Sequence, residues 1–214
     1  MNLVIQEFPL LLQGAYYTLL ITLVSMFFGL IIGLIVALMR LNGNWLISAI
    51  ARVYVSIIRG TPILVQIFIV YYGLPDVGIK LEPLTAAYIS LSINIGAYLS
   101  ETFRGAILSI PKGQMEAAMS LNMTYVQAMR RIIIPQAARV AIPPMGNTFI
   151  GMLKETSLVS VITVTELLRA SQLLISKHLT VMPFFIAIAI MYWIMSTVFS
   201  AILQQVEKRL AKGY

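Results

Sequence analysis

The sequence predicts an all-α integral membrane protein, and its composition and hydrophobic pattern support this class. Of the 214 residues, 59% are hydrophobic and only 11% are charged, and the mean hydropathy is +0.90. A soluble domain carries about a quarter charged residues, so the natural solvent of this chain is lipid. The apolar runs lack the two-residue alternation of a β-barrel, and helices satisfy their own backbone polar groups within a bilayer. We expect one domain over residues 1–214, without internal repeats.

Five apolar runs are candidates for membrane-spanning helices, since a crossing needs about 20 apolar residues. The expected crossings run from about Leu11 to Met39, Pro62 to Tyr72, Leu84 to Ile107, Ile132 to Leu153 and Met182 to Leu203. The second run is short and extends at most toward Val77. The fourth contains Pro135, Pro143 and Pro144, and we expect it to be broken at these residues.

The basic residues set the predicted orientation, because loops rich in Lys and Arg stay on the cytoplasmic side. With five crossings, one face receives eleven of the fifteen basic residues: Arg40, Arg52, Arg59, Arg104, Lys112, Arg130, Arg131, Arg139, Lys208, Arg209 and Lys212. The other face receives Lys80, Lys154, Arg169 and Lys177. We therefore expect the N-terminus outside, and the C-terminus and the loop after the third run in the cytoplasm. Basic residues that flank apolar runs do not indicate nucleic-acid binding.

Several classes of chemistry are excluded by composition and motif. The chain has no cysteine and a single histidine, His178, so disulfides, thiolate catalysis and a histidine-based metal cluster are not expected. It also lacks a Gly-x-x-x-x-Gly-Lys-Ser/Thr phosphate-binding loop and the Gly-x-Ser-x-Gly motif of hydrolases. We expect no enzyme activity and no bound cofactor, so that any energy from ATP has to enter through another subunit.

A polar segment over about residues 109–124 interrupts the apolar chain. Pro111 suits a first helical turn, and good helix formers from Gln114 to Leu121 predict a short helix. Asn122 tolerates the left-handed conformation that ends a helix, and Thr124 can cap a second helix that starts near Tyr125. This pattern fits either an ordinary amphipathic loop at the membrane surface or a docking element. Small alanines beside charged side chains would favour close packing of a partner.

The segment resembles the Glu-Ala-Ala loop of ATP-binding-cassette importer permeases. Residues 116–118 match the Glu-Ala-Ala signature, and Ile132 and Pro135 match the Ile-x-Leu-Pro that follows it. Asn122 stands where the family has glycine, and Ile134 stands where it has leucine. The resemblance implies that the short helix sits in a cleft on a separate ATPase. The coupling residues that it implies are Glu116, Ala117, Ala118, Leu121, Asn122 and Arg130.

Three further segments look like those of polar amino acid permeases, and among these the chain is most similar to cystine permeases. They are residues 59–62, 101–105 and 153–158. The resemblance implies a type I importer permease fold with five crossings in a bacterial cytoplasmic membrane. It also implies a complex of two permease chains, as a homodimer or a heterodimer, two ATPase subunits that bind ATP and Mg²⁺, and an extracellular or periplasmic solute-binding protein.

Polar residues at membrane depth are costly, so each is a candidate for solute binding. The candidates are Asn94, Tyr98, Glu101, Lys154, Glu155, Thr156 and Ser157. Asn94, Tyr98 and Glu101 are spaced for one helical face. Two alternatives stay open: Glu101 can pair with Arg104, and Lys154 can form a structural pair with Glu155. The near cancellation of these charges favours a polar solute close to neutral, such as cystine.

Two other interpretations of the chain remain. An ion-coupled secondary transporter would have carboxylates in mid-span and paired broken helices, and the sequence shows neither. A membrane-embedded enzyme would need a nucleophile, a base or a metal set, which the sequence lacks. Separately, Gly29 and Gly33 form a small-xxx-small pattern that can mark a helix-packing face, although such patterns also arise by chance.

Overall fold

The computed structural model describes residues 2–41 and 43–211, and over these ranges the chain is helical, with no strand. Lys212, which entered the predicted charge bias, lies outside the described residues. The α-helices are α1 (Asn2–Gln6), α2 (Phe8–Leu41), α3 (Trp45–Gly60), α4 (Ile63–Phe68), α5 (Pro83–Leu108), α6 (Lys112–Ser120), α7 (Tyr125–Ala128), α8 (Ile134–Glu155), α9 (Leu167–His178) and α10 (Met182–Ala211). The π and 3₁₀ segments are η1 (Ile69–Gly73), η2 (Leu74–Val77), η3 (Met129–Ile133) and η4 (Thr156–Ile162).

The most extensive helix contact joins α2 to α5, and glycines allow it. A Cβ atom on Gly29 would lie 1.9 Å from Cγ2 of Ile95, and one on Gly33 would lie 2.8 Å from Cβ of Leu99. Gly96 reciprocates from α5, where an added Cβ would lie 2.6 Å from a methyl group of α2. The two backbones therefore approach too closely for larger residues. The packing role suggested for Gly29 and Gly33 is confirmed.

Two described helices, α2 and α10, are each long and apolar enough to cross a bilayer alone. Two bent pairs also qualify: α3 with Ile63–Val77, turned by 105°, and Tyr125–Ile162 with α9, turned by 49°. Helix α5 has 26 residues, but buried serines and Asn94 lower its apolar character. Length and composition thus give two to four candidate crossings, and the predicted number of five is not confirmed.

The predicted second crossing, from Pro62 to Tyr72, differs from the structure. Instead, α3 forms a separate amphipathic helix, which Asn44 caps by accepting a hydrogen bond from the N–H of Leu46 at 2.9 Å. Its buried Ala51 packs against α2, while its charged side chains lie on the other faces. Because Arg52 interrupted the apolar run, the hydrophobic pattern hid this helix. The chain then turns sharply into α4, η1 and η2.

The predicted break in the fourth run is also wrong. Helical structure runs without interruption from Tyr125 to Glu155 through α7, η3 and α8, and both Pro143 and Pro144 lie inside α8. Pro135 is the second residue of α8 and directly follows the π segment η3, so it also lies inside this continuous helical run. Helices α5 and α10 pack along α8 and hold it together where the prolines remove backbone hydrogen bonds.

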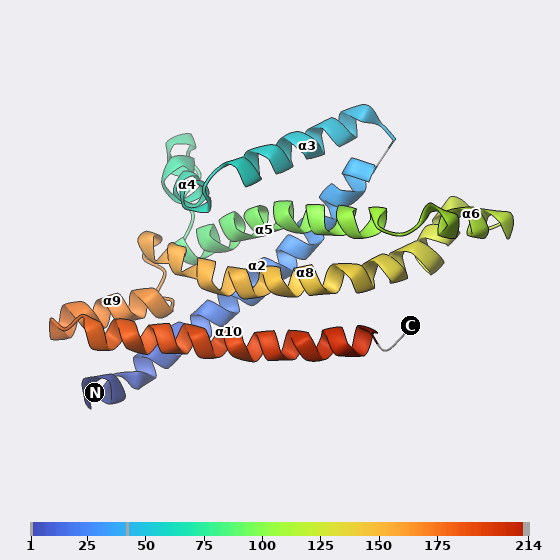
Figure 1. The fold of residues 1–214 in the computed structure, drawn as a ribbon. Helices are drawn as coiled ribbons and strands as arrows, with labels where there is room; N and C mark the ends of the chain where they lie inside the picture. The colour runs from blue at the N-terminus through green and yellow to red at the C-terminus, as the bar shows by residue number, and fades with distance from the viewer. Residues whose placement is uncertain (1, 42, 212–214) are drawn as a thin grey trace.

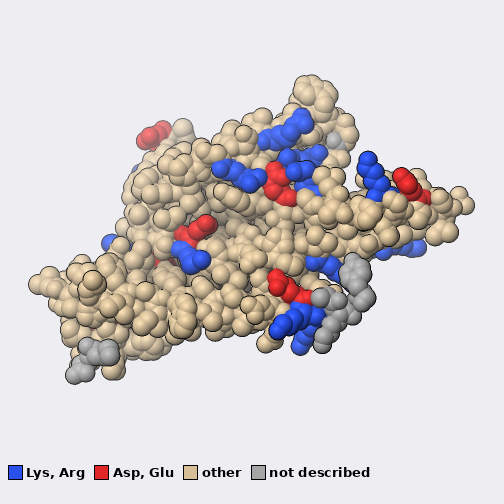
Figure 2. Space-filling model, viewed as in Figure 1, with Lys and Arg blue, Asp and Glu red and all other residues tan. Residues whose placement is uncertain are grey.

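The elements are arranged with two distinct ends (Figure 1). The N-terminus and α9 lie at one end, whereas α6 and the C-terminal end of α10 lie at the other. Figure 2 shows Lys and Arg side chains gathered mainly over the half that holds α6. This distribution agrees with the charge bias expected from the sequence.

A buried carboxylate, that of Glu166, connects three helices at the end of the molecule where the N-terminus lies. Glu166 is fully buried at the N-cap of α9 and accepts hydrogen bonds from the N–H groups of Leu168 and Arg169, at 2.9 and 2.8 Å. It also accepts one from the hydroxyl of Tyr192 in α10, at 2.8 Å. The hydroxyl of Thr18 in α2 accepts the preceding N–H of α9 at 3.2 Å. All three donors of the first turn of α9 therefore have partners.

A second carboxylate, Glu7, joins the start of α2 to the end of α9. Its Oε1 lies 2.5 Å from Nζ of Lys177 and 2.8 Å from Nε2 of His178. The hydrogen bond from Lys177, followed by that with His178, holds the pKa of Glu7 below its ordinary value of 4.5.

Candidate functional site

Helix α6 ends in a left-handed turn at Asn122, whose φ is 56°. The N–H of Asn122 donates to the carbonyl of Met119 at 3.0 Å, and the N–H of Met123 donates to the carbonyl of Ala118 at 3.2 Å. These two bonds define a Schellman motif. The prediction that Asn122 takes the conformation for which relatives use glycine is confirmed.

The next helix begins where the sequence indicated. The hydroxyl of Thr124 accepts a hydrogen bond from the N–H of Gln127 at 3.3 Å, and the side chain of Gln127 accepts one from the N–H of Thr124 at 2.9 Å. This capping box starts α7 at Tyr125, as predicted. Pro111 occupies the N-cap of α6, so α6 begins at Lys112. Local hydrogen bonds therefore close the C-terminal end of α6, whereas Pro111 makes no side-chain capping bond at its start.

Most of the predicted coupling residues face solvent. The exposed ones are Glu116, Ala117, Leu121, Asn122 and Arg130. Leu121 is 76% exposed and Met119 is 50% exposed, and α6 projects beyond the helical bundle (Figure 1). Ala118 is only 1% exposed. Its predicted contribution to an outer docking surface is therefore corrected: Ala118 packs inward and supports α6 from behind.

Glu101 in α5 is surrounded by three arginines. The expected pair with Arg104 is present, with Oε2 of Glu101 accepting from Nε at 3.1 Å and from Nη2 at 2.9 Å. Arg40 of α2 binds Oε1, and Nη1 of Arg59 lies 3.5 Å from the same atom. The guanidinium of Arg59 also lies 5.2 Å from the ring centre of Tyr98. The cluster joins α2, α3 and α5 and holds a surplus of positive charge.

Asn94 is buried, and its amide has a partner within the chain. Its Nδ2 donates to Oε1 of Gln66 at 3.0 Å. Nε2 of Gln66 in turn donates to the carbonyl of Ile58 at 2.8 Å and to the hydroxyl of Thr61 at 2.9 Å. Asn94 and Gln66 thus fasten the corner between α3 and α4 to α5. Gln66 could not be singled out from the sequence, because its roles depend on the corner between α3 and α4 and on Asn94, which is 28 residues away.

The candidates after the fourth run have different environments. Lys154 and Glu155 are exposed, and the ion pairs in the described part of the chain include neither of them. Thr156 is fully buried and donates to the carbonyl of Leu153 at 2.8 Å. The hydroxyl of Ser157 donates to the carbonyl of Lys154 at 2.7 Å. The alternative in which Lys154 and Glu155 form a structural ion pair is therefore not seen in the described part of the chain.

The two sets of candidate solute residues do not converge within one chain. Tyr98 and Glu101 lie in the second half of α5, on the way to α6. Residues 154–157 lie where α8 ends, which is the side from which α5 begins (Figure 1). The sequence could not show this separation, because it depends on the antiparallel run of α5 and α8.

The chain belongs to the family of binding-protein-dependent transport system inner membrane components, whose model matches residues 29–212. It is 44% identical over 211 residues to the L-cystine transport system permease protein TcyB of Bacillus subtilis (strain 168), covering 98% of this chain and 90% of that protein. It is 40% identical over 204 residues to the glutamine transport system permease protein GlnP of Escherichia coli (strain K12), covering 94% and 93%.

Solved structures agree with the family. The crystal structure of an amino acid ABC transporter with histidines superposes with a TM-score of 0.93 at 39% identity, covering 96% of each chain. The MetNI methionine ABC transporter in inward-facing conformations has the same fold, with a TM-score of 0.73 at 23% identity, covering 92% of this chain and 96% of that one. The predicted membership among ABC importer permeases is confirmed, and none of these matches supports a secondary transporter.

Proposed function

We propose that this chain is the membrane subunit of an ATP-driven importer of a polar, near-neutral amino acid such as cystine, and that α6 transmits force from a separate ATPase. The names of the cystine and glutamine permeases among its relatives support the solute class. The importer is proposed to contain two permease chains, two ATPase subunits that hold ATP and Mg²⁺, and a solute-binding protein. A homodimer is the simplest assembly, because one chain supplies only one α6.

The tip of α6 is the observation that carries the coupling role. Leu121 and Met119 are exposed outside the bundle, beside the charged Glu116. Large apolar side chains at the end of a helix that closes in a hydrogen-bonded turn have the form of interface anchors, and the neighbouring charge sets register. Closure of the ATPase pair would move α6 as one body and carry the movement into α5 and α8, which it joins.

The topology proposed for the importer has five crossings with the N-terminus outside. They are α2, the bent pair of α3 with Ile63–Val77, α5, the run Tyr125–Ile162 with α9, and α10. Helix α5 can be less apolar than the others because α2, α3, α4 and α8 pack around it. The basic residues near α6 and at the end of α10 support a cytoplasmic location for this end.

The solute path is proposed to use the candidates whose side chains are exposed or partly exposed. These are Tyr98, Glu101, Lys154, Glu155 and Ser157. Asn94 and Thr156 are buried, so their proposed role is to shape the path rather than to contact solute. Lys154 and Glu155 offer one charge for each ionic group of an amino acid, and the lack of an ion pair leaves both available.

The coupling role is tested by Leu121→Asp in the importer reconstituted with its ATPase and binding protein. A buried leucine anchor contributes about 1.5–3 kcal/mol, so we expect assembly to weaken by about 10-fold or more and solute-stimulated ATP hydrolysis to fall with it. Insertion into the membrane should stay normal, since Leu121 is exposed in the isolated chain.

A matched control is Leu179→Asp. Leu179 is 89% exposed at the opposite end of the molecule and, like Leu121, occupies the C-cap of its helix. This variant should retain the ATPase. If Leu121→Asp binds the ATPase and hydrolyses ATP like the unmodified protein, α6 is not the coupling element. Binding of radiolabelled cystine, glutamine and other amino acids to the reconstituted importer then decides the solute.

A further inference from the structure

Two adjoining cavities lie behind α6. The first has a volume of about 700 Å³ and is bounded by the ends of α2 and α5 and by α6, α7 and η3. The second has a volume of about 310 Å³ and lies deeper, between α2, α5 and α8. Leu38, Ile107 and Ile134 line both cavities, so the two adjoin, and together they are here called the α6 groove.

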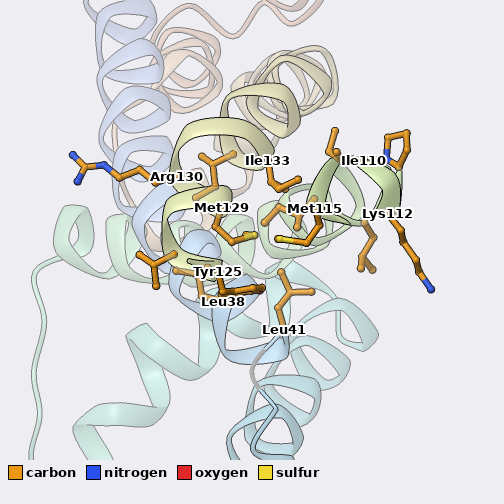
Figure 3. A pocket seen from close by; sticks show the side chains of 14 residues that line it. Leu38, Leu41, Ile110, Lys112, Met115, Tyr125, Met129, Arg130 and Ile133 are labelled. Atoms are coloured by element: carbon orange, nitrogen blue, oxygen red, sulfur yellow. The ribbon is translucent and has the colours of Figure 1, made fainter. Parts of the chain in front are cut away.

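The walls of the α6 groove are apolar where it is deep. Every side chain that lines the second cavity is apolar, and on α8 Ala137, Ala138 and Ala141 leave room. Nearer the opening, Met115 and Met129 point toward one another across the space (Figure 3). A peptide segment would bring unpaired backbone amides into this region, which is costly, whereas a hydrocarbon chain has no polar group to satisfy.

Positive charge flanks the opening of the groove. Lys112 of α6 and Arg130 of η3 both line the first cavity, and their charged ends point outward on opposite sides of it (Figure 3). Neither is among the ion-paired residues of the described chain. Arg131 follows directly and is also exposed. Among the described residues that line the groove none is acidic, so the opening favours an anionic group.

On the α2 side, the groove is lined by apolar side chains that are exposed. Leu34 and Leu38 of α2, which line it, are each 47% exposed, and α2 is a membrane-crossing candidate. Tyr125, at the opening, is 59% exposed, and amphipathic rings of this kind lie at headgroup level. The order from depth to opening is hydrocarbon-like wall, aromatic ring and cation, which matches the order of groups along a phospholipid.

We propose that the α6 groove binds an anionic phospholipid, with an acyl chain in the deep cavity and the phosphate near Lys112 or Arg130. Basic pockets between membrane helices have this ligand chemistry. The lipid would pack between α6 and the ends of α2 and α5 and so hold α6 in position. This role is separate from force transmission by α6 and does not depend on the identity of the transported solute.

The test uses the full-length chain, extracted in mild detergent with the subunits that it retains. Dioleoyl phosphatidylglycerol or dioleoyl phosphatidylcholine is added, and bound lipid is counted by native mass spectrometry. We expect phosphatidylglycerol to be retained and phosphatidylcholine to bind more weakly. Lys112→Gln and Arg130→Gln should be compared singly: loss of the phosphate-binding cation should weaken binding about fivefold, the factor that corresponds to about 1 kcal/mol per cation near a membrane surface.

Ala138→Phe tests the acyl site, because Ala138 is exposed and lines the deep cavity, so the larger ring fills space without entering the core. It should reduce binding of phosphatidylglycerol severalfold. Val140→Phe adds bulk to an exposed position of the same helix outside the groove, and Lys208→Gln removes a cation from the end of α10. Both controls should bind lipid like the unmodified chain.

Three results would overturn the proposal. Equal retention of the two lipids would show that the cations do not select the headgroup. Unchanged binding in Ala138→Phe would place the lipid elsewhere. Lipid that binds the isolated permease but is absent when a second permease chain or an ATPase is present would show that a protein subunit, not lipid, occupies the groove.

Discussion

The hydrogen bond between Tyr192 and Glu166 should contribute measurably to stability, because the carboxylate is fully buried and serves three donors. Tyr192→Phe removes one hydrogen bond to a carboxylate, which corresponds to about 2 kcal/mol. Glu166→Ala removes the N-cap of α9, at about 1 kcal/mol, and leaves a buried hydroxyl unpaired, at about 1–3 kcal/mol. We therefore expect Glu166→Ala to cost about 3 kcal/mol in the free energy of unfolding.

The two effects should not add, and a double-mutant cycle measures this. With Glu166 replaced by alanine, Tyr192→Phe removes an unpaired hydroxyl and should cost nothing or stabilise the protein. Unfolding by dodecyl sulfate in mixed micelles, followed by circular dichroism, gives the four free energies. Tyr16→Phe is the control, because Tyr16 is 60% exposed, and it should change stability by less than about 0.5 kcal/mol. An equal cost of Tyr192→Phe in both backgrounds would refute this account of the Glu166 site.

Three further predictions concern close packing, the turn after α6 and pH. Gly29→Ala should destabilise the protein by about 1–3 kcal/mol in the same unfolding assay, because the added methyl group meets Ile95. Gly105→Ala is the control and should not destabilise the protein, because the space around Gly105 is open. Equal effects of the two substitutions would contradict close packing at Gly29. Asn122→Val should lower the free energy of unfolding by about 1–2 kcal/mol and raise the rate of hydrogen exchange at the end of α6, because valine disfavours the left-handed turn. Asn122→Gly should have neither effect. Unchanged protection from exchange in the valine variant would argue against the left-handed turn. Glu7→Gln should lower the unfolding temperature near neutral pH, because the pKa of Glu7 is lowered in the folded state. The loss of stability should be full above pH 4.5, the ordinary pKa of Glu7, and should vanish as the pH falls through the lowered pKa. A deficit that stays constant down to about pH 3 would exclude the ion pairs of Glu7 as its cause.

The features that could be predicted from the sequence are those with local causes. The turn at Asn122, the cap at Thr124 and the pair of Glu101 with Arg104 depend on residues a few positions apart. Gly29 and Gly33 were recognisable because their spacing alone places both on one helical face. Each of these predictions needed only helix geometry and the chemistry of one or two side chains.

The features that were missed depend on contacts between distant segments. Glu166 lies in an undistinguished polar stretch of the sequence, and only the fold brings it to Tyr192. Gln66 acquires its role from a corner that the apolar pattern did not reveal. Ala118 belongs to the Glu-Ala-Ala signature that indicated the family. Which of the two alanines of this signature faces outward depends on how α6 packs against the rest of the chain. Sequence spacing cannot supply such long-range geometry.

The uninterrupted helical run from Tyr125 to Glu155 has a consequence for how such importers diversify. At 1.5 Å per residue it is about 45 Å long, so the residues next to the proposed ATPase contact and those next to the proposed solute lie at opposite tips of one rod. Substitutions at such a distance act additively as a rule. Residues at the solute tip can therefore be exchanged without changing the effect on stability of substitutions at the ATPase tip.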